Sequence, residues 1–239
     1  ALREGVEVKR IKADVETGEG TLQRGSFLIA LSQKNRGMVQ NILEGYPVPH
    51  LEPKSLEGIS AETMRQPRIA LVETYFHDMD AGWTRFIMDE YHIPYDVLKP
   101  HELTEADLEK DYDVVLIPDT DKNLLLEGKY KSGSTYYLGN YHPDYVKGMG
   151  KEGRDKLVSF LDKGGKIVCW GRSSELFEGV LSLEDGKEKE EFQLPYSDIS
   201  SSLRKEGLYV PGSFIRIRLK QNHPLTLGMP AETGVFSRG

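Results

Sequence analysis

From Pro67 onward, short continuous runs of hydrophobic residues alternate with segments in which hydrophobic residues recur at helical spacing. Runs of this length are typical of strands buried on both faces of a parallel sheet. We expect four such strands, at Arg68–Glu73, Tyr95–Leu98, Asp113–Ile117 and Ile167–Trp170. Because strands that alternate with helices form parallel sheets covered on both faces, the pattern predicts a three-layer α/β sandwich with a mostly parallel sheet.

Two helices are predicted between these strands. Asp80–His92 carries large apolar side chains at helical spacing, which we expect to face the core: Trp83, Phe86, Ile87 and Tyr91. Gly153–Lys163 is predicted to be an amphipathic helix that ends at a pair of glycines, which can adopt the left-handed capping conformation. Ser213–Leu219 alternates polar and apolar residues and predicts a late antiparallel extension of the sheet.

Residues 1–66 follow a different pattern. Val6–Ile11 alternates weakly, Ser26–Leu31 is a β-rich run, and the prolines of Pro47–Pro53 prevent regular structure. We therefore predict that residues 1–66 form a small β-containing connecting segment with a linker. Residues 67–239 are predicted to form the α/β domain.

Composition narrows the classes of partner. The chain has 239 residues and a net charge of −7, and it lacks an extended basic stripe, which argues against nucleic acid as a partner. No run approaches the ~18 apolar residues of a membrane span. A single cysteine excludes an internal disulfide and a cysteine-rich zinc site. The chain opens without Met and stops soon after an apolar run, so we expect it to be part of a longer protein.

Leu161–Phe177 is predicted to contain a helix end, a buried strand, a sharp turn and a new helix, which is the layout of a nucleophile elbow. Such a turn requires small residues two positions before and after the nucleophile. Cys169 at that position would place the bulky Ile167 at one of these sites. Gly171 there is flanked by Cys169 and Ser173, which are both small. The second register is favoured, so Cys169 is expected to be an inert filler and no catalytic residue is predicted.

Polar residues follow the strands at the edge where open α/β sheets bind ligands. Glu73 ends the first strand, and the loop after it holds His77, Asp78 and Asp80, which we interpret as helix-capping residues rather than metal ligands. Asp119 and Asp121 follow another strand and are expected to be turn carboxylates. Arg172 follows the elbow turn, where either an anionic ligand or a salt bridge would suit it. We predict a ligand-binding crevice lined by Glu73, Asp80, Asp119, Gly171 and Arg172, with no metal site.

Two segments, YDVVLIPD (Tyr112–Asp119) and LVSFLDKGGKIVCWGRSSELF (Leu157–Phe177), carry a resemblance to a known fold. Together they resemble the class I glutamine amidotransferase-like fold, which has a flavodoxin-like sheet. Alignment on Gly164-Gly165 places Gly171 at the position of that family's catalytic cysteine. The family's downstream His and Glu find no match. The resemblance therefore implies the fold without its catalysis.

Three further segments, Met79–Leu98, Pro211–Leu219 and His223–Pro230, are similar to the C-terminal region of bacterial zinc carboxypeptidase-like proteins of the M14 peptidase family. The resemblance implies a non-catalytic accessory domain, structural or binding a ligand or partner. Its partner would be an upstream peptidase domain of the same polypeptide. No histidine here is followed by Glu three residues later, so the zinc cofactor is expected only in that domain. Such proteins are typically exported to the periplasm or the extracellular space.

Two alternatives remain open at this point. One is a divergent hydrolase that uses Cys169 or the carboxylates of the crevice. The other is a carbohydrate-binding module, because Thr120–Tyr145 is rich in tyrosine. A small ligand, a peptide and a glycan are all compatible with the crevice.

Overall fold

The computed structural model describes residues 1–46, 48–55, 57–76, 78–130, 142–183, 188–193, 200–221 and 223–237. For residues 178–183, 188–193, 200 and 201 it describes the backbone alone. The chain divides into two compact units. One, the α/β unit, is Pro67–Leu203, and the other, the β-rich unit, combines Ala1–Gln66 with Arg204–Gly239.

The α/β unit is built on a four-stranded parallel sheet. Its strands are β6 (Ile69–Val72), β7 (Asp96–Leu98), β8 (Val114–Ile117) and β9 (Lys166–Cys169), in the order β7-β6-β8-β9. The four strands expected from the apolar runs are all present, with ends that differ from the expected ones by at most one residue. Because the chain returns past β6 to build β8, the strand order reverses between these two strands, which is where such sheets bind ligands.

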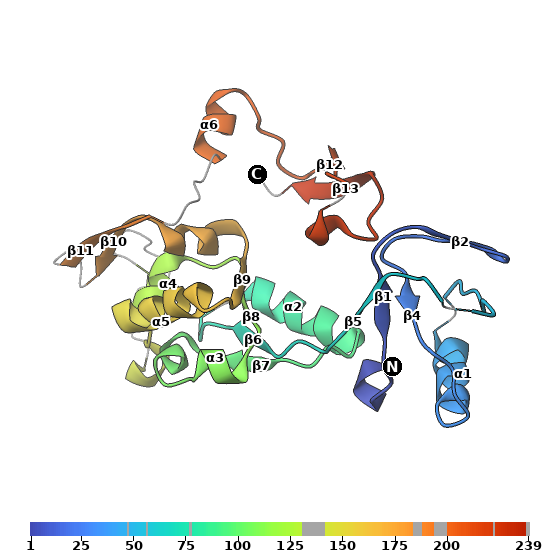
Figure 1. Ribbon diagram of the computed structural model, residues 1–239. Helices are drawn as coiled ribbons and strands as arrows, with labels where there is room; N and C mark the ends of the chain where they lie inside the picture. The colour runs from blue at the N-terminus through green and yellow to red at the C-terminus, as the bar shows by residue number, and fades with distance from the viewer. Residues whose placement is uncertain are drawn as a thin grey trace. The chain divides into compact units, whose positions relative to one another are not determined.

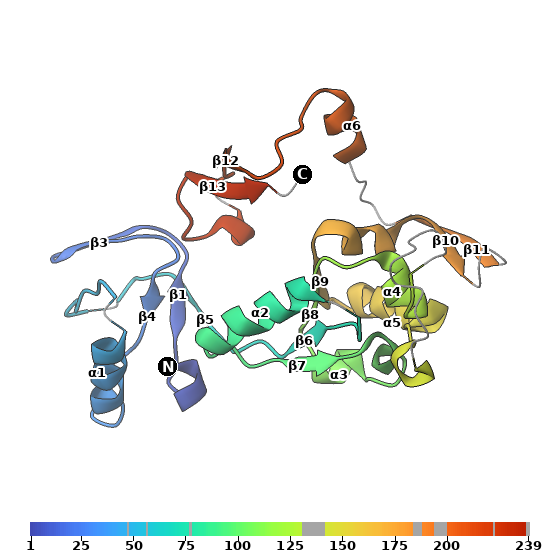
Figure 2. The ribbon, with the colours of Figure 1, turned by 180° about the vertical axis from the view of Figure 1, so that it is seen from behind.

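Helices flank this sheet on both sides, so the predicted mixed α/β class with a parallel sheet is confirmed. Figures 1 and 2 show α2 (Met79–Glu90) on one side of the sheet and α5 (Gly150–Asp162) on the other. The remaining elements of the unit, with α6 at its junction to the β-rich unit, are η2 (Pro100–Thr104), α3 (Leu108–Asp111), α4 (Lys122–Glu127), η3 (Pro143–Tyr145), η4 (Gly171–Phe177), β10 (Glu178–Leu183), β11 (Glu188–Gln193) and α6 (Ser200–Lys205).

The hydrophobic core lies between the sheet and α5. Alternate residues of the central strands point into it, and Leu157 and Phe160 of α5 pack against them. The other members of this buried cluster come from η2, α3, α4, the loop before α5 and η4: Leu103, Leu108, Leu125, Leu126, Met149, Leu176 and Phe177. Burial of this face explains why the amphipathic pattern of Gly153–Lys163 was a sound signal for a helix.

Helix α2 forms close to where the sequence predicts it, but it packs with the opposite face. Trp83, Phe86, Ile87 and Tyr91, expected in the core, are 60%, 54%, 52% and 75% exposed. The prediction of their burial is wrong. The residues buried on α2 are Ala81 and Met88, seven positions apart and so on one helix face.

The N-terminal cap sets this orientation of α2. The side chain of Asp78 accepts hydrogen bonds from the backbone N–H of Ala81 at 3.0 Å and of Thr74 at 3.1 Å. These two bonds tie the first turn to the end of β6 and fix which residues face the sheet. Ala81, in this first turn, is fully buried, which hydrophobic spacing alone does not reveal.

The β-rich unit contains short antiparallel strands. β1 (Lys9–Ile11) lies between β4 (Phe27–Leu28) and β5 (Ala61–Thr63), and β2 (Val15–Thr17) pairs with β3 (Gly20–Leu22). The other elements are η1 (Leu2–Glu4), α1 (Arg36–Gly45), β12 (Ser213–Arg218), η6 (Pro224–Thr226) and β13 (Glu232–Ser237).

The C-terminal hairpin is placed differently from the sequence expectation. Strand β12 pairs with β13 in a separate two-stranded sheet, and no pairing of either strand with the parallel sheet is found in the described residues. Residues 204–239 therefore cluster with residues 1–66 and not with the α/β domain. The approach is close at one point, where a Cβ on Gly25 would lie 3.1 Å from the Gly228 nitrogen.

Candidate functional site

The predicted crevice residues lie mostly at one edge of the parallel sheet. Glu73 directly follows β6, Asp119 comes two residues after β8, and Gly171 and Arg172 follow β9. Since the carboxyl ends of parallel strands share an edge, these four residues belong to the edge at which the strand order reverses. The fifth, Asp80, lies in the first turn of α2, where Asp78 is the capping residue.

Asp119 and Arg172 form the contact that closes the turn after β9. The backbone N–H of Arg172 donates to Oδ1 of Asp119 at 2.7 Å, and Nε donates to the same oxygen at 3.1 Å. Nη2 lies 3.4 Å from Oδ2. This hydrogen-bonded pair raises the pKa of Arg172. Of the two roles considered for Arg172, the structure therefore shows the salt bridge.

Gly171, in this turn, has a backbone conformation that residues with a side chain rarely adopt. Its φ is +63°, in the left-handed region. A Cβ built on it would lie 2.4 Å from Oδ1 of Asp119 and 2.6 Å from its Cγ. Any side chain at position 171, including a nucleophile, thus requires Asp119 to move and to give up the N–H of Arg172.

The residues around the turn have structural partners. Ser173 is fully buried, and its hydroxyl lies 2.8 Å from the carbonyl oxygens of both Ile117 and Trp170. Ser173 belongs to a 3-10 helix, η4, and not to the α-helix of a nucleophile elbow. Cys169 is half-buried at the end of β9, and burial raises the pKa of its thiol. A raised pKa leaves less thiolate at neutral pH, which works against a nucleophilic role.

Glu73 is held by two cations. Its carboxylate lies 3.2 Å from Nη1 of Arg85 and 3.3 Å from Nζ of Lys99. Lys99 Nζ also donates to the carbonyl oxygen of Thr74 at 3.4 Å. The carboxylate and its two cations form one ion-pair cluster at the end of β6, which fixes the position of the Lys99 ammonium group.

An aromatic cluster beside Glu73 was not found from the sequence. The ring of Tyr75 stacks on His101 with centroids 5.9 Å apart and meets Tyr145 edge-on at 5.5 Å. Lys99 Nζ lies 4.9 Å from the centroid of Tyr75, within cation–π range. His142 lies 6.0 Å from Tyr145. We call Tyr75, Lys99, His101, His142 and Tyr145 the aromatic cluster.

The aromatic cluster presents rings to solvent, because Tyr75 and Tyr145 are both exposed. The position of Tyr75 three residues after the buried strand β6 was the available sequence signal. Tyr145 belongs to the tyrosine-rich stretch Thr120–Tyr145, of which residues 131–141 lie outside the described residues, as does His77. Exposed rings next to cations are suited to stacking on a ring or an apolar group of a ligand.

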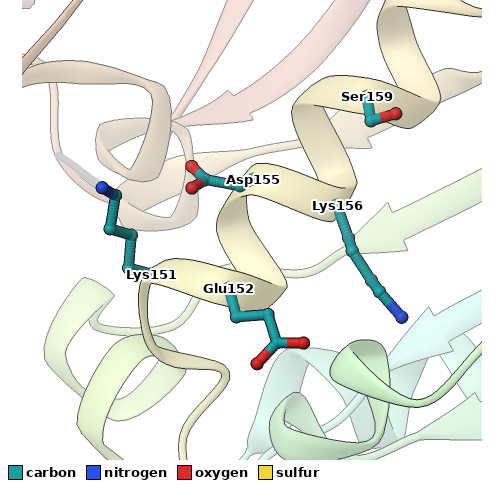
Figure 3. A pocket seen from close by; sticks show the side chains of 5 residues that line it. All are labelled: Lys151, Glu152, Asp155, Lys156 and Ser159. Carbon is teal, nitrogen blue, oxygen red and sulfur yellow. The ribbon is translucent and has the colours of Figure 1, made fainter.

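A shallow depression runs along α5, away from the strand ends. Figure 3 shows its lining side chains, all on this helix: Lys151, Glu152, Asp155, Lys156 and Ser159. Lys156 donates from Nζ to the carbonyl oxygen of Thr104, and Asp155 accepts a hydrogen bond from Arg154 at 2.7 Å. Lys156 thus ties α5 to η2, whereas the contact of Asp155 lies within α5, and the depression does not extend the candidate site.

Among the described residues, no group of three or more His, Cys, Asp and Glu side chains is arranged to hold a metal ion. Within the same ranges, no helix is both long and apolar enough to cross a membrane. Comparisons with protein-family models, with curated proteins and with solved structures find no match to this chain. The resemblances drawn from the sequence motifs therefore stay predictions.

Proposed function

We propose that the α/β unit is a non-catalytic, amidotransferase-like accessory domain of an M14 zinc carboxypeptidase-like protein, and that it binds a ligand at the carboxyl edge of its sheet. On this proposal the partner is an upstream peptidase domain of the same polypeptide, which holds the zinc, and the protein is exported. The family part of the proposal is supported by the motifs in Met79–Leu98, Pro211–Leu219 and His223–Pro230.

The observation that carries the non-catalytic part is the geometry at Gly171. The position that delivers the nucleophile in an elbow holds a glycine, and the Asp119 carboxylate fills the space of its missing side chain. Cys169, two residues earlier, has a raised pKa because of burial. The carboxylates of Glu73 and Asp119 are both held by cations. None of these groups is prepared for nucleophilic or acid–base work.

Purified protein tests this part directly. We expect no glutaminase or amidase activity, and slow labelling of Cys169 by a thiol-reactive probe. Amidase activity that disappears in Cys169→Ala would overturn the proposal in favour of a thiol hydrolase. Activity lost in Glu73→Gln or Asp119→Asn but kept in Cys169→Ala would favour a carboxylate hydrolase instead.

A second candidate, a carbohydrate-binding module, is favoured by one observation. The exposed rings of Tyr75 and Tyr145 lie beside Lys99, and aromatic rings next to polar groups suit the apolar faces and hydroxyls of sugars. Binding to a glycan panel would support it if Tyr75→Ala and Tyr145→Ala abolish the signal. The matched control is Tyr209→Ala, an exposed tyrosine of the β-rich unit, which should leave binding unchanged.

A further inference from the structure

Helix α2 carries an exposed apolar stripe on the face that points away from the sheet. Its members are spaced by three, four and seven residues and so lie on adjoining turns of one face: Met79, Trp83, Phe86, Ile87 and Tyr91, the last directly after the helix end. The rings of Trp83 and Phe86 meet edge-on with centroids 5.8 Å apart. We call these five residues the α2 stripe.

The α2 stripe is large for an exposed surface. Each member is more than half exposed. With about 200 Å² for each large side chain, the stripe presents about 600 Å² of mostly apolar surface. Patches of ~300–600 Å² are the largest that typical monomers expose and are often functional. The stripe supplies most of the ~800 Å² that one partner contributes to a standard interface.

Charges around the stripe restrict its partner. Helix α2 carries Asp80, Asp89 and Glu90 against a single basic residue, Arg85. Glu90 lies seven residues after Trp83 and therefore on the same face, at the helix end where the macrodipole is already negative. The guanidinium of Arg85 is engaged with Glu73 at 3.2 Å. The border of the α2 stripe is thus acidic.

A second copy of this chain fits these charges poorly. If two α2 helices pair antiparallel, Asp80 of one copy faces Glu90 of the other, and if they pair parallel, each faces its own equivalent. Both arrangements place like charges together at the rim of the interface, which disfavours association. A partner with Lys or Arg beside its apolar residues would instead form a complementary pair with Glu90.

We propose that the α2 stripe is a docking surface for a basic amphipathic helix of another polypeptide. The apolar side of that helix packs on Trp83, Phe86 and Ile87, and its basic residues lie beside Glu90 at the C-terminal end of α2. Trp83, the largest ring at the centre of the stripe, is the expected anchor of the interface. None of the five residues of the α2 stripe belongs to the strand-end site, so the inference does not depend on the proposed function.

A model peptide tests the proposal without knowledge of the natural partner. The probe is a dye-labelled peptide of leucine and lysine at helical spacing, and its counterpart has glutamate at every lysine position. Fluorescence anisotropy should show the full chain binding the lysine peptide at least about tenfold more tightly than the glutamate peptide. High salt should reduce this preference. Equal affinity for the two peptides, or no binding of either, would overturn the proposal.

Variants locate the binding to the stripe. Trp83→Ala should weaken binding of the lysine peptide about 30-fold, as expected for a central aromatic anchor, and Ile87→Ala should weaken it to a smaller extent. Glu90→Lys keeps the apolar residues and should shift the preference toward the glutamate peptide, which a purely structural effect would not do. Phe214→Ala, an exposed phenylalanine of β12, is the matched control and should bind as the native chain does.

Other occupants give distinct results. Sedimentation equilibrium that shows a dimer abolished by Trp83→Ala would overturn the proposal in favour of a second copy. Trp83-dependent binding to phosphatidylcholine vesicles, without binding of the lysine peptide, would overturn it in favour of a membrane surface. Circular dichroism of each variant should match the native chain, because the substituted side chains are largely exposed.

Discussion

Replacing Gly171 by alanine tests the arrangement that separates this chain from a nucleophile-bearing elbow. Two costs add at this position. A residue with a Cβ loses about 1–2 kcal/mol in the left-handed conformation that Gly171 adopts. The new Cβ would also lie 2.4 Å from the Asp119 carboxylate, which must move and release the N–H of Arg172. A hydrogen bond to a charged group contributes about 1.5–3 kcal/mol, so the two costs together give an expected loss of about 2.5–5 kcal/mol.

Urea unfolding followed by tryptophan fluorescence is a suitable assay. Both tryptophans, Trp83 and Trp170, belong to the α/β unit, so the signal reports the unit that contains Gly171. With an m-value of about 2 kcal/mol/M, the expected loss lowers the unfolding midpoint by about 1.3–2.5 M. An unchanged m-value would show that stability, and not the extent of unfolding, has changed.

Gly150 is the matched control. Its φ is +57°, close to that of Gly171, but a Cβ there meets no atom within 4 Å. Gly150→Ala should therefore lose only the conformational cost of about 1–2 kcal/mol. In the Asp119→Ala background the two nearest atoms are gone, so Gly171→Ala should cost at least about 1 kcal/mol less than in the native chain. The reasoning is refuted if Gly171→Ala is no more destabilising than Gly150→Ala.

Three further predictions concern packing and ionisation. Phe160→Ala should lower the free energy of unfolding by about 3–5 kcal/mol because the ring is buried, whereas Phe86→Ala should change it by about 0.5 kcal/mol or less. Similar losses for the two variants in urea titrations would contradict the exposed position of Phe86. The labelling rate of Cys169 should keep rising at pH values above the pKa of a free thiol, because burial raises its pKa; a plateau near neutral pH would show an activated thiolate. Burial also raises the pKa of Asp78 in the folded chain. The stability of the native chain relative to Asp78→Asn should therefore be highest at acid pH and fall as pH rises through the folded pKa. Urea midpoints that move the opposite way would show that the hydrogen bonds of Asp78 outweigh its burial.

The parallel sheet could be predicted because its signal is local. The apolar runs in Ile69–Val72 and Val114–Ile117 are short and continuous. All four residues of β6 are buried, as a strand covered on both faces requires, and in β8 buried residues alternate with half-buried ones. The glycine at the elbow was also recognisable, since a sharp turn with small flanking residues restricts a few adjacent positions. In both cases, residues adjacent in the sequence are sufficient to predict the structure.

The packing face of α2 could not be predicted in this way. Its most hydrophobic stripe is exposed. The buried side carries Ala81, whose N–H donates to the capping side chain of Asp78, as does the N–H of Thr74. Hydrophobic spacing identifies an amphipathic helix but assumes that its apolar side faces its own sheet. The same limit applies to the hairpin of β12 and β13, whose alternation predicts strands but not the unit with which they cluster.

By itself, the sequence determined the class of the fold, the strands of its parallel sheet and the glycine at its elbow, because each depends on the sizes and polarities of adjacent residues. Tertiary structure decided the pairing of Asp119 with Arg172, the two cations on Glu73, the aromatic cluster around Tyr75 and the exposure of the α2 stripe. These features join residues that are far apart in the chain. Their energies depend on which elements meet and at what angle, and no local pattern of residues contains that information.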